Sequence, residues 1–157
     1  MKWYYCIFLF AIFACNEEQL TVTEDAVGAD ILYSKDSYKP YTGKCIVLYN
    51  KSDKVKEEFR FKKGLLDGES SAWYKNGQIR RKGYYNKGQI SGKWTFWDEQ
   101  GNKTLEAHYR HDTLNGTYIA LYANGNIKEK GQYSANKQSG KWTRYDEDGK
   151  VIQSASR

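Results

Sequence analysis

Short runs in which apolar and polar residues alternate recur along most of the chain, separated by stretches rich in Asn, Asp and Gly. Three of these units read SAWY-KNGQ-IRRKGYY, WTFW-DEQGN-KTLEAHY and YIALY-ANGN-IKEKGQY. Alternation with a period of two is typical of a strand that buries one face. The pattern therefore predicts pairs of antiparallel strands joined by tight turns, and an all-β fold.

Glycines mark a repeat in the same region. Gly43, Gly68, Gly92, Gly116 and Gly140 are separated by 25, 24, 24 and 24 residues. A fixed period of this kind indicates stacked copies of one supersecondary unit. We therefore expect residues 31–157 to form a domain of about five repeats, an elongated single-layer antiparallel meander of stacked β-hairpins. The first repeat carries an insertion and the fifth is truncated, so both are interpreted as caps.

The turns set the register expected within each hairpin. Asn-Gly at 76–77 and 124–125 predicts two-residue type I′ turns, whereas 98–101 and 146–149 predict type I turns closed by a glycine bulge. The opposed pairs that follow are Cys45 with Phe59, Tyr74 with Ile79, Trp94 with Ala107, Tyr118 with Gly131, and Tyr122 with Ile127. Glycines in mid-strand at 83 and 131 would leave room for a neighbouring ring.

One face of this sheet is the candidate binding surface. It is expected to carry Leu48, Trp73, Trp97, Leu121 and Tyr145, interleaved with Lys56, Arg80, Lys128 and Lys130. Rings can stack on a sugar or seat a partner, and cations attract an anionic one, so the candidate residues are Trp73, Trp97, Tyr145, Arg80 and Lys128. The alternative interpretation is that both faces of a thin sheet need rings to bury enough area.

The first residues of the chain follow a different pattern. Residues 3–15 contain no charge and follow Lys2, which is typical of a secretory signal and too short to span a bilayer. Residues 12–15, Ile-Phe-Ala-Cys, resemble the lipoprotein box of bacteria, in which a peptidase cuts before a cysteine that becomes lipidated. Residues 1–14 are thus expected to be a lipoprotein signal peptide, with lipid on Cys15 binding the membrane. The alternative is that Cys15 is an apolar residue near a conventional cleavage site.

The net charge of +6 is the sum over an acidic segment and a basic domain. Residues 16–30 hold five acidic residues and no cation, whereas residues 31–157 hold 24 basic and 14 acidic residues. Residues 15–30 are therefore expected to be the lipidated cysteine and an acidic tether. The basic repeat domain favours an anionic partner. The expected location is the bacterial cell envelope, lipid-anchored at the outer membrane and either periplasmic or surface-exposed.

The repeat resembles a known family. The pattern G-x-W-x-x-Y-x-x-x-G followed by I-x-x-x-G-x-Y is similar to the variant MORN repeat, and KPYTGKCIVLY at 39–49 resembles the entry segment of the YwqK-like "antitoxin component" family. The resemblance covers residues 38–157 and implies stacked hairpins that serve as an interaction scaffold rather than as an enzyme. The expected function is a non-enzymatic envelope lipoprotein that binds a protein or an anionic glycan. The alternative is an antitoxin or immunity protein that neutralises a toxin by direct binding.

Residues that could carry chemistry form no recognised motif. His108 and His111 are three apart, so on a strand they would point to opposite faces, and we expect no metal. No serine has a histidine base in a known motif, and no glycine-rich phosphate loop occurs, so we expect no catalytic residue and no cofactor. Cys45 is expected in the core. Export disfavours nucleic acid as a partner, and open sheet edges favour self-association.

Overall fold

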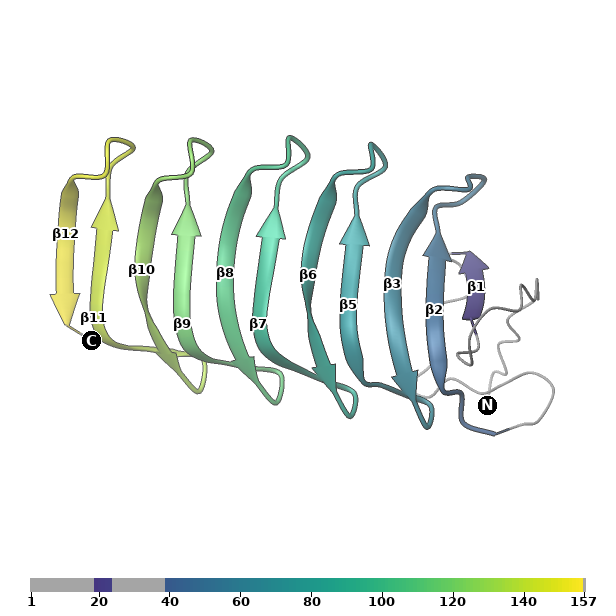
Figure 1. Ribbon diagram of the computed structural model, residues 1–157. Coiled ribbons are helices and arrows are strands. Elements are labelled where there is room, and N and C mark those ends of the chain that lie inside the picture. The colour runs from purple at the N-terminus through teal and green to yellow at the C-terminus, as the bar shows by residue number, and fades with distance from the viewer. Residues whose placement is uncertain (1–18, 24–38, 157) are drawn as a thin grey trace.

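The computed structural model describes residues 19–23 and 39–156, and this part of the chain forms one sheet without helices (Figure 1). The strands are β1 (Gln19–Thr23), β2 (Gly43–Leu48), β3 (Val55–Lys62), β4 (Leu65–Leu66), β5 (Gly68–Trp73), β6 (Ile79–Asn86), β7 (Gln89–Trp97), β8 (Lys103–Arg110), β9 (Thr113–Leu121), β10 (Ile127–Ser134), β11 (Lys137–Tyr145) and β12 (Val151–Ser156). They follow one another in chain order across the sheet, except that β4 pairs with β3 beside this path. The expected all-β, single-layer antiparallel meander of stacked hairpins is confirmed.

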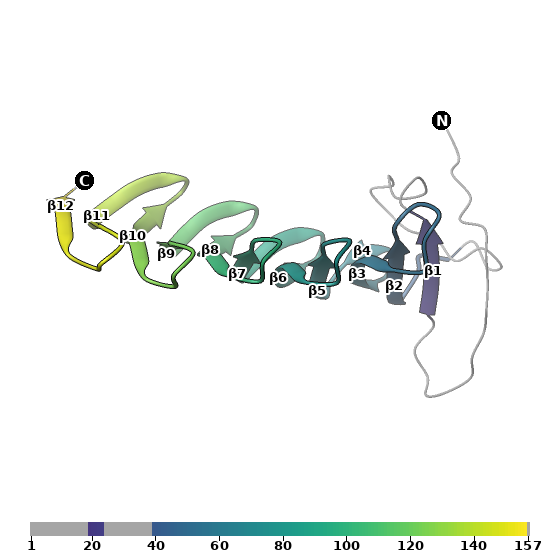
Figure 2. The same ribbon diagram turned by 90° about the horizontal axis from the view of Figure 1, so that it is seen from above.

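Each repeat is a hairpin of an outgoing strand (β2, β5, β7, β9 or β11) and a returning strand (β3, β6, β8, β10 or β12). Seen from above, the chain proceeds from β2 to β12 without folding back (Figure 2). The hairpin turns therefore form a row along one long edge of the sheet. The inter-repeat turns, which join each returning strand to the next hairpin, form a row along the opposite edge (Figure 1).

The register predicted for the middle of the strands is confirmed. Cys45 lies opposite Phe59, Trp94 opposite Ala107, and Tyr118 opposite Gly131. These positions line the buried face, where Trp94 is 2% exposed and Cys45 is 4% exposed. Cys45 is a core residue, as expected. Its thiol packs in a cluster with Val47 and Phe59.

Two glycines allow the largest rings to lie flat on the sheet. A Cβ atom at Gly83 would collide with the ring of Trp94, and one at Gly131 would collide with the ring of Trp142. Each ring crosses its glycine, and its Nε1 donates a hydrogen bond to the carbonyl of the next residue, Tyr84 (3.2 Å) or Gln132 (3.1 Å). The expectation that these glycines make room for a ring is confirmed, and the ring comes from the following repeat.

The prediction of type I′ turns at 76–77 and 124–125 is wrong. Gly77 has a φ of 92° and Gly125 a φ of 86°, but the asparagine before each glycine is not in the positive-φ region that a type I′ turn requires. Gly77 N–H donates to the carbonyl of Tyr74 (2.9 Å), and Tyr74 N–H donates to that of Gln78 (2.8 Å). The same hydrogen bonds occur at 98–102 and 146–150. The turn at 122–126 has them too, so these four of the five hairpin turns are type I turns followed by a left-handed glycine.

This turn shifts the register beside it by one residue. Ile79 lies opposite Trp73 rather than Tyr74, and Ile127 lies opposite Leu121 rather than Tyr122. The asparagine side chain favours the observed turn, because Oδ1 of Asn76 accepts a hydrogen bond from the N–H of Gln78 (2.9 Å).

Type I′ turns occur instead at the inter-repeat turns. Positive φ at both central residues is found at 63–64, 87–88, 111–112 and 135–136. In two of these turns, a side chain accepts a hydrogen bond from the backbone near the start of an outgoing strand in the preceding repeat. Asp112 Oδ1 accepts from the N–H of Ile90 in β7 (2.7 Å), and Asn136 Oδ1 accepts from that of Leu114 in β9 (2.8 Å). These bonds help to offset the cost of about 1 kcal/mol for a non-glycine residue in the left-handed region.

The features predicted for the N-terminal part of the chain fall mostly outside the described residues. This applies to the signal peptide (1–14), to Cys15 and to most of the tether (15–30). Within the expected tether, residues 19–23 form β1, which pairs in parallel with β2. This part of the segment is thus a strand rather than a flexible linker. Its sequence, QLTVT, holds no charge and is rich in residues that favour strands, and β2 offers it an open edge.

Candidate binding surface

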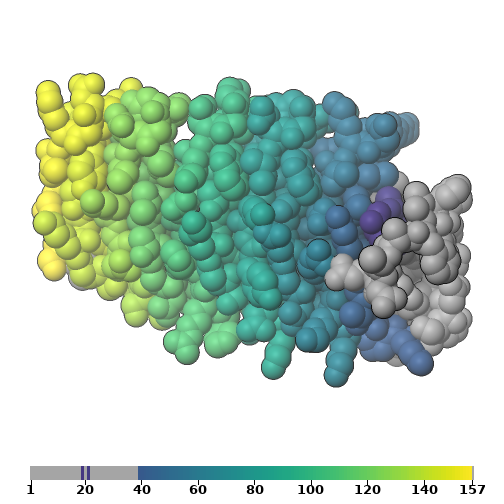
Figure 3. Space-filling model, in the orientation of Figure 1, coloured from purple at the N-terminus to yellow at the C-terminus, as the bar shows by residue number. Residues whose placement is uncertain are grey.

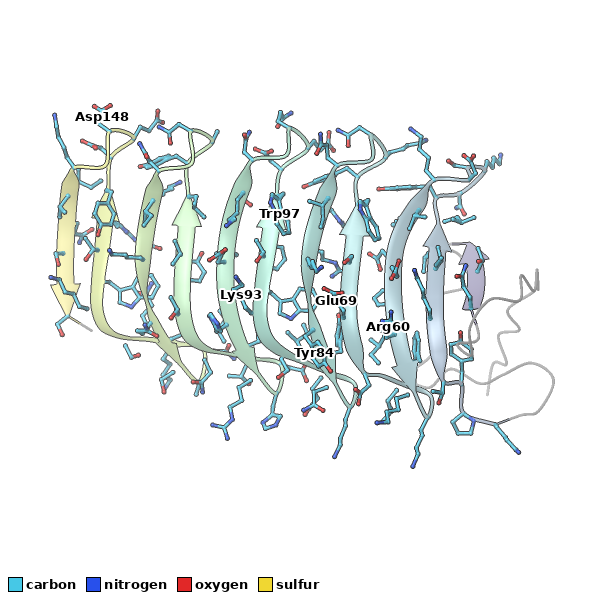
Figure 4. All side chains as sticks on the ribbon, viewed as in Figure 1. Arg60, Glu69, Tyr84, Lys93, Trp97 and Asp148 are labelled. Carbon is cyan, nitrogen blue, oxygen red and sulfur yellow. The ribbon has the colours of Figure 1, made fainter. Side chains whose placement is uncertain are left out.

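The predicted row of rings exists at one end of the outgoing strands. Trp73, Trp97 and Tyr145 are each the last residue of such a strand, at positions equivalent to Leu48 and Leu121. Figure 4 shows Trp97 near the hairpin-turn end of β7. The three rings are half-buried. They therefore offer partial rather than full faces to a ligand.

Arg80 and Lys128 do not join this row. Each sits at a β-bulge that follows a hairpin turn, where the strand changes register. Arg80 Nη2 pairs with Oε1 of Glu57 at 3.0 Å. Lys128 Nζ lies 5.6 Å from the ring centroid of Tyr122. The five candidate residues therefore do not form one continuous row, because the bulges turn the side chains of Arg80 and Lys128 away from the three rings.

Many of the cations in the middle of the sheet are neutralised by nearby carboxylates. Lys44 pairs with Glu58 (2.8 Å), Lys82 pairs with Glu69, and Lys103 pairs with Glu106 (2.8 Å). The hydrogen bond from Lys103 holds the pKa of Glu106 below its usual value, against the opposing effect of partial burial. The centre of this face is thus a mixed ladder of charges rather than an anion site.

The inter-repeat turns carry a second, more strongly charged surface, which we name the basic edge. Its exposed cations are Lys62, Lys63, Lys87, Arg110 and Lys137. None of them pairs with a carboxylate in the described part of the chain. Long side chains from successive repeats project side by side from this edge (Figures 3 and 4). Two acids lie nearby, Asp67 and Asp112, and one oxygen of Asp112 already accepts the N–H of Ile90.

The hairpin turns on the opposite edge carry more acidic than basic residues. Their acidic residues are Asp53, Asp98, Glu99, Asp146, Glu147 and Asp148, and their lysines are Lys51, Lys54, Lys75 and Lys150. The two long edges of the sheet therefore differ in the sign of their charge. An anionic ligand is attracted to the basic edge and repelled from the other.

An exposed ring lies beside the basic edge. Tyr84 is 47% exposed, the most exposed aromatic side chain in the described residues. It lies two residues before the end of β6, and Figure 4 shows it close to the inter-repeat turns, with Lys93 on the neighbouring strand. A flat apolar ring beside cations offers both stacking and charge to a ligand.

Sequence reasoning missed the basic edge because its cations do not recur at one fixed offset. The inter-repeat turns read Lys-Gly, Lys-Gly, His-Asp and Ala-Asn, and the cation falls before, within or after them. Counting charge at every second turn, rather than at every twenty-fourth residue, would have revealed it.

In residues 19–23 and 39–156, no three His, Cys, Asp or Glu side chains gather as metal ligands would. His111 lies in an inter-repeat turn with a φ of 51°, and His108 lies in β8. A hollow beside Trp142 and Ala155 holds about 10 Å³, room for roughly one water. The described part of the chain has no helix that is long and apolar enough to cross a bilayer.

Three segments of the chain match the MORN repeat variant: residues 66–87, 114–135 and 138–156. Each match covers one hairpin, β5–β6, β9–β10 or β11–β12. No curated protein matches the chain. MORN repeats commonly serve as interaction modules. Three of the five hairpins are therefore similar to the MORN repeat variant, and the other two share the glycine spacing of these three.

Proposed function

We propose that this chain is a non-enzymatic binding protein of the bacterial cell envelope that holds an anionic glycan along its basic edge. The observation that supports this most is the row of cations at the inter-repeat turns, none of which pairs with a carboxylate of the described residues, next to the exposed ring of Tyr84. Electrostatic attraction would bring the ligand to this edge, and the ring would orient a sugar unit.

The spacing of the cations favours a polymer over a compact ligand. Successive inter-repeat turns are two strands apart in the sheet, which corresponds to about 10 Å. Lys63, Lys87, Arg110 and Lys137 therefore form a line of charges at nearly regular intervals. A glycan with a charge on each repeating unit could contact several of them at once, and each further contact would form at a high effective concentration.

Replacing Lys87, Arg110 and Lys137 together by glutamine is expected to weaken binding of polygalacturonate about tenfold. Each exposed charge contact contributes roughly 0.5 kcal/mol, and three of them amount to about one order of magnitude in affinity. Binding by the unaltered chain should also weaken as salt is added, because exposed charges are screened. Biolayer interferometry on the immobilised chain would measure both effects.

The matched control replaces Lys51, Lys75 and Lys150 by glutamine. These exposed lysines lie on the opposite edge, so the change in net charge is the same. Equal losses in the two triple variants would show that only net charge matters and would contradict the proposed edge. Tighter binding of poly-glutamate than of polygalacturonate would point to an acidic protein partner instead. Capture of one toxin-like protein from the neighbouring gene would favour the antitoxin alternative.

The envelope location rests on the proposed lipid anchor at Cys15. We expect wild-type chain produced in a diderm bacterium to incorporate radiolabelled palmitate and to sediment with membranes. Cys15→Ser should abolish the label and release most of the chain into the soluble fraction, because membrane affinity scales with the buried acyl chains. Cys6→Ser is the control and should leave the label unchanged. A membrane fraction unaltered by Cys15→Ser would contradict the anchor.

A further inference from the structure

The two ends of the sheet differ in how their edges are covered. At one end, β1 pairs with the outer side of β2, and this is the parallel pair of an otherwise antiparallel sheet. At the other end, β12 pairs with β11, and no described strand pairs with its outer side. Val151 is 59% exposed there and Ile152 is 64% exposed. Apart from Tyr84, these are the exposed large apolar residues of the described chain.

β12 lacks the charged and proline residues that commonly keep an edge strand from pairing, and its β-bulge at Ile152 has counterparts in β6 and β10, which do pair with a further strand. Its sequence, VIQSAS, contains no charged residue and no proline. Natural edge strands commonly carry a lysine, a proline or an inward-pointing charge that blocks a further strand. The outer side of β12 is therefore open to another strand.

The repeat itself defines which strand would fit. Across each inter-repeat junction, a returning strand pairs with the next outgoing strand in the same register: Glu57 with Ala72, Arg81 with Phe96, Leu105 with Ala120, and Glu129 with Arg144. Gln153 is the equivalent of Glu129, because it pairs with Arg144 as Glu129 pairs with Ala120. Val47 is the equivalent of Ala72, because it pairs with Glu57 as Ala72 pairs with Arg81.

Continuing this series places Gln153 opposite Val47 and Ala155 opposite Cys45. The side chains are compatible with that contact. At existing junctions a small residue faces each ring, as Ala107 faces Tyr118 and Gly131 faces Trp142. Ala155 and Cys45 are both small, so the two backbones could approach without a clash. The remaining pairs would be Ser154 with Ile46 and Ser156 with Lys44, and Lys44 already pairs with Glu58 at 2.8 Å, so no charge would be left without a partner.

We propose that β12 of one copy pairs with β2 of a second copy after β1 leaves that edge, so that copies join head to tail. The pairing is antiparallel and extends the repeat across the junction. β1 then acts as a removable cover of the β2 edge that competes with the second copy. This inference concerns the ends of the sheet and does not depend on the ligand of the basic edge.

A disulfide trap tests the proposal directly. Ala155→Cys is introduced into the full chain carrying Cys6→Ser and Cys15→Ser, so that Cys45 and position 155 hold the thiols. In one copy these positions are nine strand spacings apart, about 43 Å, which is far beyond the reach of a disulfide. Directly opposed residues of paired antiparallel strands lie within that reach. A disulfide between Cys45 and the thiol introduced at position 155, formed under native conditions, must therefore join two copies.

We expect mild oxidation in detergent to give dimers and longer chains on a non-reducing gel, with the peptide that joins Cys45 to position 155 identified by mass spectrometry. Ser154→Cys in the same background is the matched control. It points to the other face and should give several-fold less linkage to Cys45. Monomer alone, or disulfides that join position 155 of one copy to position 155 of another, would overturn the proposal.

Two proline variants test the role of the edges in the same background. Gln153→Pro removes a donor from β12 and should suppress the link between Cys45 and position 155. Thr21→Pro weakens β1 and should raise that link several-fold, because the cover of β2 is lost. Unchanged linkage in Gln153→Pro would overturn the β12 edge as the contact. Unchanged or reduced linkage in Thr21→Pro would overturn the role of β1 as a competitor.

Discussion

Gly83→Ala should lower the free energy of unfolding by about 3 kcal/mol. The added methyl group would lie within the ring of Trp94, which is 2% exposed and has no room to move away. Tyr85 packs edge-on against that ring at 5.3 Å, and Phe96 lies 6.3 Å from it. Gly83 is not in the left-handed region, so the cost is steric rather than conformational. Urea denaturation followed by tryptophan fluorescence would measure it.

Gly77→Ala is the control for this substitution. Gly77 lies in a hairpin turn with a φ of 92° and no atom within 4 Å of an added Cβ, so its cost should be conformational and about 1 kcal/mol. In a chain already carrying Trp94→Ala, the cost of Gly83→Ala should largely disappear, because the two changes act on one contact. Equal destabilisation by Gly83→Ala and Gly77→Ala would contradict the ring-over-glycine packing.

Trp94→Ala should have the largest effect on stability, a loss of about 3 to 5 kcal/mol. The ring lies near the middle of the sheet, where each hairpin is supported by its neighbours alone. Loss of the ring should therefore uncouple the hairpins on either side of β7. We expect the urea transition to broaden, and hydrogen exchange to show strands near β7 opening before those farther away.

Trp142→Ala provides the matched comparison. Trp142 makes the same contacts two repeats later, with Tyr133 at 5.2 Å and its Nε1 bonded to the carbonyl of Gln132. Because it lies one strand from the end, its loss should free β11 and β12 while β2 to β7 keep their protection. If either variant lost protection uniformly along the sheet, the description as a chain of nearest-neighbour hairpins would be wrong.

The sequence predicted the middle of each hairpin well and its ends poorly, for a physical reason. In mid-strand, the alternation of large and small residues specifies the register, as for Trp94 with Ala107 and Tyr118 with Gly131. Beside the Asn-Gly turns, the geometry depends on contacts with another repeat. The side chain of Asn76 donates to the carbonyl of Glu99 (2.8 Å), and no local pattern in the sequence reveals that bond.

The candidate binding residues show the same limit. Strand alternation correctly placed Trp73, Trp97 and Tyr145 at equivalent positions, since each ends an outgoing strand. It could not place Arg80 and Lys128, because a bulge changes which face a side chain occupies and a bulge is not visible in the alternation. The pairing of Arg80 with Glu57 also joins residues 23 positions apart.

The tyrosine hydroxyls near the hairpin turns have a consequence for how such a chain can change length. Tyr49 donates to the carbonyl of Trp73, Tyr74 to that of Trp97, and Tyr122 to that of Tyr145, each reaching one repeat ahead. A duplicated repeat would thus supply both the tyrosine that donates to the next repeat and the carbonyl that accepts from the preceding one. Gene duplication or deletion could lengthen or shorten the sheet in steps of about 10 Å and leave the remaining junctions intact.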